Sequence, residues 1–327
     1  MWARQATARY TGGAVDTSQA TKNGKRRRSV RVVSLGSGSS GNALVVQAGA
    51  TSVLLDAGFP VSGLVNRMRR AQVAPERINA ILLTHEHHDH TCGAVAFARR
   101  FGAPLISDPR TLEATLAQRR GQIEPTPPSS IERVELPVGR STSVDTLQVR
   151  SFAVSHDAAA PCGFVVSSGA WRLCYITDTG MVSEAMVEAM AESSLLLIES
   201  NHDRDRLLNG PYPWHLKQRI LSPTGHLSND QTSEALLRVL DDAPRWVWLG
   251  HLSRTNNTPD IARAHLRERL RQVGLRHITP QISPPGVGEV WDSSTLWGSA
   301  APDSREQSPH SDAAPLAPTQ PARRRSL

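Results

Sequence analysis

Short apolar runs rich in β-branched residues recur along the chain, and segments with helical spacing lie between them. Runs of this length predict strands where Gly, Ser, Asn or Pro bounds them, while apolar positions three and four apart predict helices. The turn-forming segment 36–42 separates the first two runs and predicts a hairpin-like start. In this first group we expect strands at residues 30–35, 43–47, 51–56 and 78–84, and helices at 61–71 and 91–101.

A second group of runs begins after the polar segment 121–128. Here we expect strands at residues 143–155, 163–167, 171–177, 194–199 and 245–250, and helices at 183–191, 230–240 and 259–273. No repeat with a period of 20–50 residues is present, which argues against a solenoid or propeller. Two groups of strands, each with its own helices, predict an α/β fold in which helices cover two sheets.

The two ends of the chain differ in composition from the span between them. Residues 1–29 are rich in Thr, Gly, Ala and Arg, residues 299–327 are rich in Pro, Ala and Ser, and neither shows periodicity. We therefore expect two disordered tails around one folded domain at 30–298. The tails account for the whole formal net charge of +7, because the first carries +6 and the second +1. Bulk charge thus gives no reason to expect the folded domain to bind nucleic acid.

Other features bear on where the protein works. No run approaches the ~18 apolar residues of a membrane-spanning helix, and no apolar segment follows the basic N-terminus as it does in a signal peptide. The three cysteines, Cys92, Cys162 and Cys174, show no CxxC spacing and fit a reducing compartment. We expect a cytoplasmic protein without membrane contact, and the sequence leaves its oligomeric state open.

The most informative segment contains four histidines and an aspartate within six residues. It directly follows the apolar run 78–84 and consists of His85, Glu86, His87, His88, Asp89 and His90. Side chains two positions apart, such as His85 and His87, point the same way on an extended chain and suit one metal ion. Asp89 and His90 suit a second ion nearby, and two close ions can clamp the oxygens of a hydrolytic displacement.

Two ions need more ligands than this segment offers. Three other candidates each follow a run of strand-forming residues: His156, Asp178 and His251. A carboxylate between two histidine-rich half-sites, as Asp178 would be, is suited to bridge both ions. We therefore predict a centre of two divalent ions, Zn²⁺ or Mn²⁺.

The complete set of motifs resembles that of the metallo-β-lactamase superfamily over about residues 30–275. The segments 34–42 and 54–58 also resemble the first strands of that family. The resemblance implies an αββα sandwich, in which two mixed sheets are flanked by helices. It assigns His85, His87 and His156 to one ion, Asp89, His90 and His251 to the other, and Asp178 to both. Asp56 would orient ligands without holding an ion itself.

Downstream residues indicate a branch of the superfamily. Glu199, His226 and the segment 250–254 resemble motifs of RNase Z and the β-CASP nucleases, and the segments 155–164 and 199–203 resemble the YycJ/WalJ-like group of DNA exonucleases. Too few residues separate Glu199 from His226 for the β-CASP insertion. No segment corresponds to the tRNA-binding arm of RNase Z. The resemblance therefore implies a DNA exonuclease of the 5′–3′ type.

The charges at the site also favour a phosphodiester substrate. Two divalent ions outweigh Asp89, Asp178 and a bridging hydroxide, which leaves a positive site for an anion. We expect a metal-bridged hydroxide, oriented by Asp89, to attack phosphorus, while His226, paired with Glu199, protonates the leaving oxygen. The residues available for flanking phosphates are Lys217, Arg219 and Arg254, and Tyr212 and Trp214 are available to stack on a base.

Two alternatives share the fold. A thioester or lactam hydrolase would not need the Glu199–His226 pair, and a small-molecule phosphodiesterase would differ in its substrate groove. A third reading is a non-catalytic protein with a decayed site, which the complete ligand set argues against. The sequence does not decide between Zn²⁺ and Mn²⁺, between DNA and RNA, or which end is cut.

Overall fold

The computed structural model describes residues 29–118, 131–288 and 290–296 of the 327-residue chain. The predictions for the two tails, apart from Ser29, lie outside these residues, as does the polar segment 121–128. Within the described ranges, the strands form two sheets of seven strands each.

The first sheet is built from the first group of strands and one late strand. Its order is β14 (Val290–Asp292), β1 (Val30–Gly36), β2 (Ala43–Ala48), β3 (Thr51–Leu55), β4 (Ala80–Leu82), β5 (Leu105–Ser107) and β6 (Arg133–Glu135). β1, β2 and β3 pair antiparallel, which confirms the hairpin start. From β3 to β6 the pairing is parallel, so this sheet is mixed.

The second sheet is also mixed. Its order is β13 (Gln281–Ile282), β12 (Trp246–Gly250), β11 (Leu195–Glu199), β10 (Trp171–Ile176), β9 (Cys162–Ser168), β8 (Leu147–Ala153) and β7 (Ser141–Val144). β7 to β10 pair antiparallel, and β10 to β13 pair parallel. As a result β8, β10, β11 and β12 all end on the same side of the sheet.

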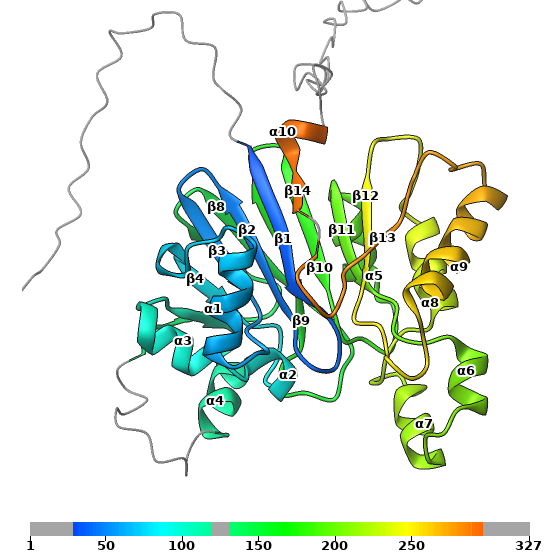
Figure 1. Ribbon diagram of the computed structural model, residues 1–327, viewed down its shortest axis with the longest axis horizontal. Helices are drawn as coiled ribbons and strands as arrows, with labels where there is room; N and C mark the ends of the chain where they lie inside the picture. Colours follow the sequence, from blue (N-terminus) through cyan, green and yellow to red (C-terminus); the bar gives the residue numbers. More distant parts are fainter. Residues whose placement is uncertain (1–28, 119–130, 289, 297–327) are drawn as a thin grey trace, which may run out of the picture.

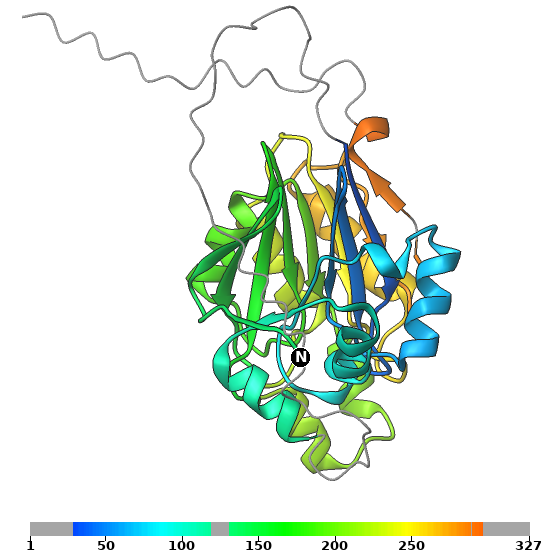
Figure 2. The same ribbon diagram turned by 90° about the vertical axis from the view of Figure 1, so that its left-hand side faces the viewer.

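The two sheets face each other and helices cover both outer faces (Figures 1 and 2). Alternation along the strands explains the layers, because successive side chains point to opposite faces. In β1, Val32 faces the core between the sheets and Val33 faces the outer helices. In β10, Tyr175 faces the inner core and Ile176 the outer one. The αββα sandwich expected from the sequence is confirmed.

Three helices pack on the first sheet and three on the second. The first set is α1 (Val61–Arg70), α3 (Ala94–Phe101) and α4 (Pro109–Ala117), and the second is α5 (Glu184–Ala191), α8 (Asn229–Leu237) and α9 (Pro259–Gln272). In Figure 1, α6 (Arg204–Asn209) and α7 (Trp214–Ile220) lie at the lower end, where α2 (His88–Thr91) also lies. Among the described residues, no helix combines the length and apolarity that a membrane span requires.

Three sequence predictions need correction. The strand expected at 143–155 is a hairpin of β7 and β8, because Asp145 adopts a left-handed φ of 47° and turns the chain. The helix expected at 91–101 begins only at Ala94, as α3, and Thr91 instead ends the short helix α2. Gly93 separates them, because its N–H donates to the Ala57 carbonyl and a Cβ there would lie 2.2 Å from the Phe59 carbonyl. The third correction concerns elements that were not expected, which include α4, β5, β6, β13, β14 and the short helices α6 and α7 with their few apolar residues.

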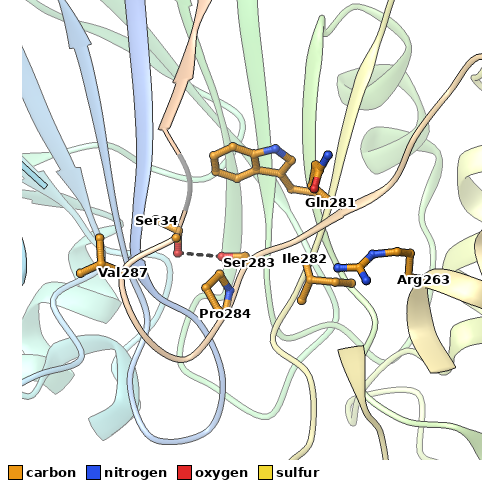
Figure 3. Close-up of a pocket in the computed structure, with 9 residues that line it drawn as sticks. Ser34, Arg263, Gln281, Ile282, Ser283, Pro284 and Val287 are labelled. Carbon is orange, nitrogen blue, oxygen red and sulfur yellow. Dashed lines mark hydrogen bonds between the residues drawn. The ribbon is translucent and has the colours of Figure 1, made fainter. Parts of the chain in front are cut away.

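A cavity of about 350 Å³ lies at the seam between the sheets, where the chain crosses from β13 toward β14 (Figure 3). The Ser34 and Ser283 hydroxyls are hydrogen-bonded at 2.7 Å and join β1 to the crossing segment. Trp248, Arg263 and Gln281 line the same cavity. None of the candidate site residues lines it.

Candidate metal centre

The candidate residues lie at the carboxyl ends of strands. Asp56 follows β3, Asp178 follows β10 after one residue, and His251 follows β12. All three have positive φ angles, of 56°, 46° and 52°. Non-glycine residues rarely adopt this conformation, and holding it costs on the order of 1–3 kcal/mol per residue. The sheets therefore maintain strained backbone at three residues of the site, as is typical of functional sites.

The structure brings the predicted ligands together in overlapping groups. In each group, the possible ligand atoms lie within 4.8 Å of one another. The groups are His85, His87 and His156; Asp89, His90 and His251; His85, His90 and Asp178; and Asp178, Glu199, His226 and His251. Asp178 thus lies between two histidine groups, which is the position the sequence predicts for a bridging carboxylate.

Four of the histidines are oriented through Nδ1. The Nδ1 atoms lie 2.8 Å from Asp56 for His90, 2.8 Å from Glu199 for His251, and 3.2 Å from the Gly225 carbonyl for His156. The fourth, His85, has Nδ1 3.0 Å from the Thr84 hydroxyl. Such contacts fix the ring and leave Nε2 as the nitrogen that can bind a metal, as in many metal sites.

Buried atoms without partners test whether this set fits metal ions. Nε2 of His85, Nε2 of His251 and Oδ2 of Asp178 are buried and make no hydrogen bond within the part of the chain that the structure describes. Asp178 Oδ2 lies 2.9 Å from His90 Nε2, but without hydrogen-bond geometry. Buried polar atoms left unpaired are costly, and these three belong to residue types that bind Zn²⁺ or Mn²⁺. The residues therefore fit a centre of divalent cations.

The electrostatics of the site agree with that fit. Burial alone would raise the pKa of Asp178, but His251 and His90 outweigh it and hold that pKa well below its usual range. Burial lowers the pKa of His251, whereas Asp178, Asp89 and Glu199 together raise it to about 10. Protons on the histidines thus balance the negative charge of the buried carboxylates. Cations in their place would displace those protons, because histidine binds metals in its neutral form.

Asp56 is a completely buried carboxylate with several donors around it. It accepts hydrogen bonds from the Thr84 N–H and hydroxyl, from His90 Nδ1 at 2.8 Å and from the Tyr175 hydroxyl at 3.1 Å. None of the four groups of possible ligand atoms includes Asp56. Its contacts correspond to the orienting role expected from the resemblance, because they hold His90 and the residue that contacts His85.

Glu199 lies at the end of β11 and joins two histidines. Its Oε1 lies 2.7 Å from His226 Nδ1 and 2.8 Å from His251 Nδ1. Its Oε2 accepts from the Thr179 and Leu227 N–H groups. Burial alone would raise the pKa of Glu199, but His226 and His251 lower it to about 2. Glu199 is therefore an ionised carboxylate that orients both rings.

A second cavity, of about 290 Å³, opens over the centre. Metal-ligand candidates and His226 line it, together with Tyr212, Leu216, Ile220 and Arg219. Arg254 does not line this cavity and donates to the Ser40 hydroxyl at 3.0 Å. Trp214, 60% exposed, lies at the start of α7 and does not line it either.

Lys217 was expected to contact phosphate, and the structure corrects this. The side chain is buried, and Nζ donates to the Leu208 carbonyl at 2.7 Å. Helical periodicity explains the error, because α7 turns Lys217 toward α6 while Arg219, two positions on, faces the cavity.

Several residues around the centre were not singled out in the sequence. Asn42 Nδ2 lies 3.0 Å from His90 Nε2, and the Ser37 hydroxyl accepts from the His251 N–H. Asn201 holds the His251 carbonyl, and Asp157 lies 3.3 Å from His156 Nε2. Each of the four lies in a segment that carries the family resemblance, and Asp157 in addition directly follows a predicted ligand.

Comparisons with known proteins agree with the fold and show the family. Residues 51–251 match the family model described as the beta-lactamase superfamily domain. The exodeoxyribonuclease WalJ of Streptococcus pneumoniae is 35% identical over 242 residues, which cover 74% of this chain and 88% of that protein. The exodeoxyribonuclease YycJ of Bacillus anthracis is 34% identical over 258 residues, covering 79% and 92%.

A solved structure gives the same result for the fold alone. The metallo-β-lactamase fold protein YhfI from Bacillus subtilis has a TM-score of 0.60 at 17% sequence identity. The match covers 81% of this chain and 99% of that one.

Proposed function

The chain belongs to the metallo-β-lactamase superfamily of metal-dependent hydrolases, and from that premise we propose that it is a DNA exonuclease. Two relatives that match most of the chain are named exodeoxyribonucleases, which supports this substrate class. The observation that carries the proposal is the pairing of His226 with Glu199 beside the metal-ligand groups, at 2.7 Å. Cleavage from the 5′ end is part of the proposal.

The ligand groups divide between two ions, Zn²⁺ or Mn²⁺. His85, His87 and His156 would hold one, Asp89, His90 and His251 the other, and Asp178 would contact both. Ions bound there would supply positive charge for a phosphate and lower the pKa of a water molecule. Asp56 would keep His90 in place through its Nδ1 hydrogen bond.

His226 is assigned the role of proton donor to the leaving oxygen. Its Nδ1 bonds to Glu199, so Nε2 is the nitrogen that carries a proton toward substrate. The side chain is 19% exposed and lines the cavity over the centre. A leaving alkoxide needs such a donor, and a positioned acid typically contributes about 10²–10⁴-fold to a rate.

Asp89 is assigned to hold and orient the attacking water. Its Oδ2 lies 3.6 Å from Nε2 of both His90 and His251, and its side chain is 25% exposed toward the cavity. A carboxylate in this position accepts a hydrogen bond from water and points a lone pair of the water's oxygen at phosphorus. On the cavity wall, Arg219 is assigned to substrate, while Arg254 lies farther out at Ser40.

One panel of substrates distinguishes this proposal from the alternatives. Metal-loaded protein is incubated with end-labelled single- and double-stranded DNA and RNA, and separately with a thioester, a β-lactam and the small phosphodiester bis(p-nitrophenyl) phosphate. We expect release of labelled mononucleotides from DNA labelled at the 5′ end. Faster turnover of the thioester or the lactam would refute the proposal in favour of an acyl hydrolase. Cleavage of only small phosphodiesters would favour the small-molecule phosphodiesterase.

His226→Ala tests the proton donor within the same panel. We expect kcat on DNA to fall by about two to four orders of magnitude, while metal content stays at the wild-type level. Full activity of the variant, or loss of the metals, would show that His226 has another role.

A further inference from the structure

The cavity over the centre has one arginine on its wall, beside the histidines of the centre. Among the described residues that line it, Arg219 is the single lysine or arginine. Tyr212, Leu216 and Ile220, which belong to the same stretch of chain, add apolar and aromatic surface beside it. The volume of about 290 Å³ lies at the lower end of small-molecule pockets. A cavity of this size and lining suits one nucleotide unit, with one neighbouring phosphate at the guanidinium.

Asp157 holds that guanidinium. Arg219 Nε and Nη2 both lie 2.8 Å from Asp157 Oδ2. Arginine has five N–H donors, and in the described part of the chain Nη1 makes no hydrogen bond. The Arg219 side chain is 58% exposed. Donors therefore remain for a phosphate while Asp157 keeps the side chain in place.

The backbone ties the same helix to the chemistry. Asp157 directly follows the ligand candidate His156, and the His226 N–H donates to the Ile220 carbonyl at the end of α7. Two contacts thus join α7 to the centre, one at Arg219 and one at Ile220. Arg219 and its helix are therefore held by residues that are adjacent to the centre or belong to it.

The other two candidate cations, Lys217 and Arg254, are not held beside the centre in this way. Lys217 Nζ donates a hydrogen bond to the Leu208 carbonyl. Arg254 lies outside the cavity and donates to the uncharged hydroxyl of Ser40. An aspartate alone at the mouth would repel a phosphate, so Asp157 is compatible with an anionic substrate only with Arg219 beside it.

We propose that Asp157 is a positioning residue that holds Arg219 against the phosphate next to the scissile one, so that the site selects polynucleotides over simple phosphodiesters. This inference rests on the proposed nuclease function. Arg219 would contact the substrate, and Asp157, which also lies 3.3 Å from His156 Nε2, would affect substrate binding through Arg219.

The test compares two substrates, a labelled oligodeoxynucleotide and bis(p-nitrophenyl) phosphate, which has no neighbouring phosphate. We expect Arg219→Ala to lower kcat/KM on the oligonucleotide by about 10–100-fold, mainly through KM. We expect a clearly smaller loss on bis(p-nitrophenyl) phosphate, because that substrate lacks the phosphate that Arg219 would contact. The slope of log KM against log salt should fall by about 0.7–0.9, as for one lost phosphate contact. Arg219→Lys should recover part of the loss, because lysine keeps the positive charge but lacks the paired N–H donors of the planar guanidinium.

A double-mutant cycle tests the role of Asp157. Asp157→Ala should raise KM on the oligonucleotide in the wild-type background and change it less than twofold in the Arg219→Ala background. Arg238→Ala is the matched control, because Arg238 forms an exposed pair with Glu184 and does not line the cavity. This control should leave both substrates unaffected.

The outcomes separate this inference from the proposed function. Equal losses on both substrates would mean that the pair is structural, and an unchanged oligonucleotide KM in Arg219→Ala would overturn the inference alone. Wild-type protein that cleaves neither substrate would contradict the proposed function and this inference with it.

Discussion

Glu199 is the residue whose replacement tests the site most sharply. It is fully buried, and its two oxygens accept four hydrogen bonds, two from histidine Nδ1 atoms and two from backbone N–H groups. In Glu199→Gln the shape is kept, but one oxygen becomes an amide that donates. Whichever way the amide turns, two donors face two donors. The conflict disappears only if His226 and His251 move their protons to Nε2, where His251 would no longer bind a metal.

The expected loss of stability follows from that count. A buried donor left without an acceptor costs about 1–3 kcal/mol, so two such donors cost about 2–6 kcal/mol. For a domain of this size, each kcal/mol lowers Tm by about 2–4 °C. We therefore expect Tm to fall by roughly 10 °C. We also expect kcat on labelled DNA to fall by about 10²–10⁴-fold, because His226 loses the carboxylate that orients its ring.

Thermal unfolding in a metal-containing buffer and single-turnover cleavage of labelled DNA measure the two effects. Glu184→Gln is the control, because Glu184 is 78% exposed and such surface changes stay within about 0.5 kcal/mol. If Glu199→Gln unfolds within 2 °C of the wild type and keeps kcat within about threefold, the assigned role of Glu199 is wrong.

Three further predictions concern Asp56, two glycines and the metal ions. Asp56→Asn should lower the metal content measured by atomic emission, because the amide cannot accept from all the donors around Asp56 and loosens His90; unchanged content would show that Asp56 is dispensable for ligand placement. Gly58→Ala should prevent folding, since its Cβ would lie 1.7 Å from the Asp89 carbonyl oxygen, whereas Gly63→Ala, with its nearest atom at 3.8 Å, should raise stability by about 0.5–1 kcal/mol. Similar melting curves for the two glycine variants would contradict that geometry. Removal of metal by chelation should lower Tm and reloading should restore it, because ions bind only the folded site; a Tm that ignores chelation would contradict a metal centre.

The placement of the candidate ligands could be predicted from local patterns. An apolar strand that ends in a polar residue directs that residue to the sheet edge, and His156, Asp178 and His251 each follow such a strand. The close spacing of the histidines after β4 needed no tertiary information at all. These patterns are local in the sequence, so they can be recognised without knowledge of the fold.

Contacts between distant segments could not be predicted in this way. Tyr175 donates to Asp56, which is 119 residues away, and nothing near either residue indicates the pair. The orientation of Lys217 depends on α7, a short helix whose sequence gives little periodicity. Asp157 acquires its significance from Arg219, which the fold brings beside it from 62 residues away.

The central claim is that the clustered ligands hold two divalent ions required to cleave DNA. Metal-free protein is titrated with Mn²⁺ or Zn²⁺ while release of labelled mononucleotide from end-labelled DNA is measured. We predict that activity is absent without metal, rises with added metal and levels off at two equivalents per chain. Full activity without metal, or a plateau at one equivalent, would contradict the claim.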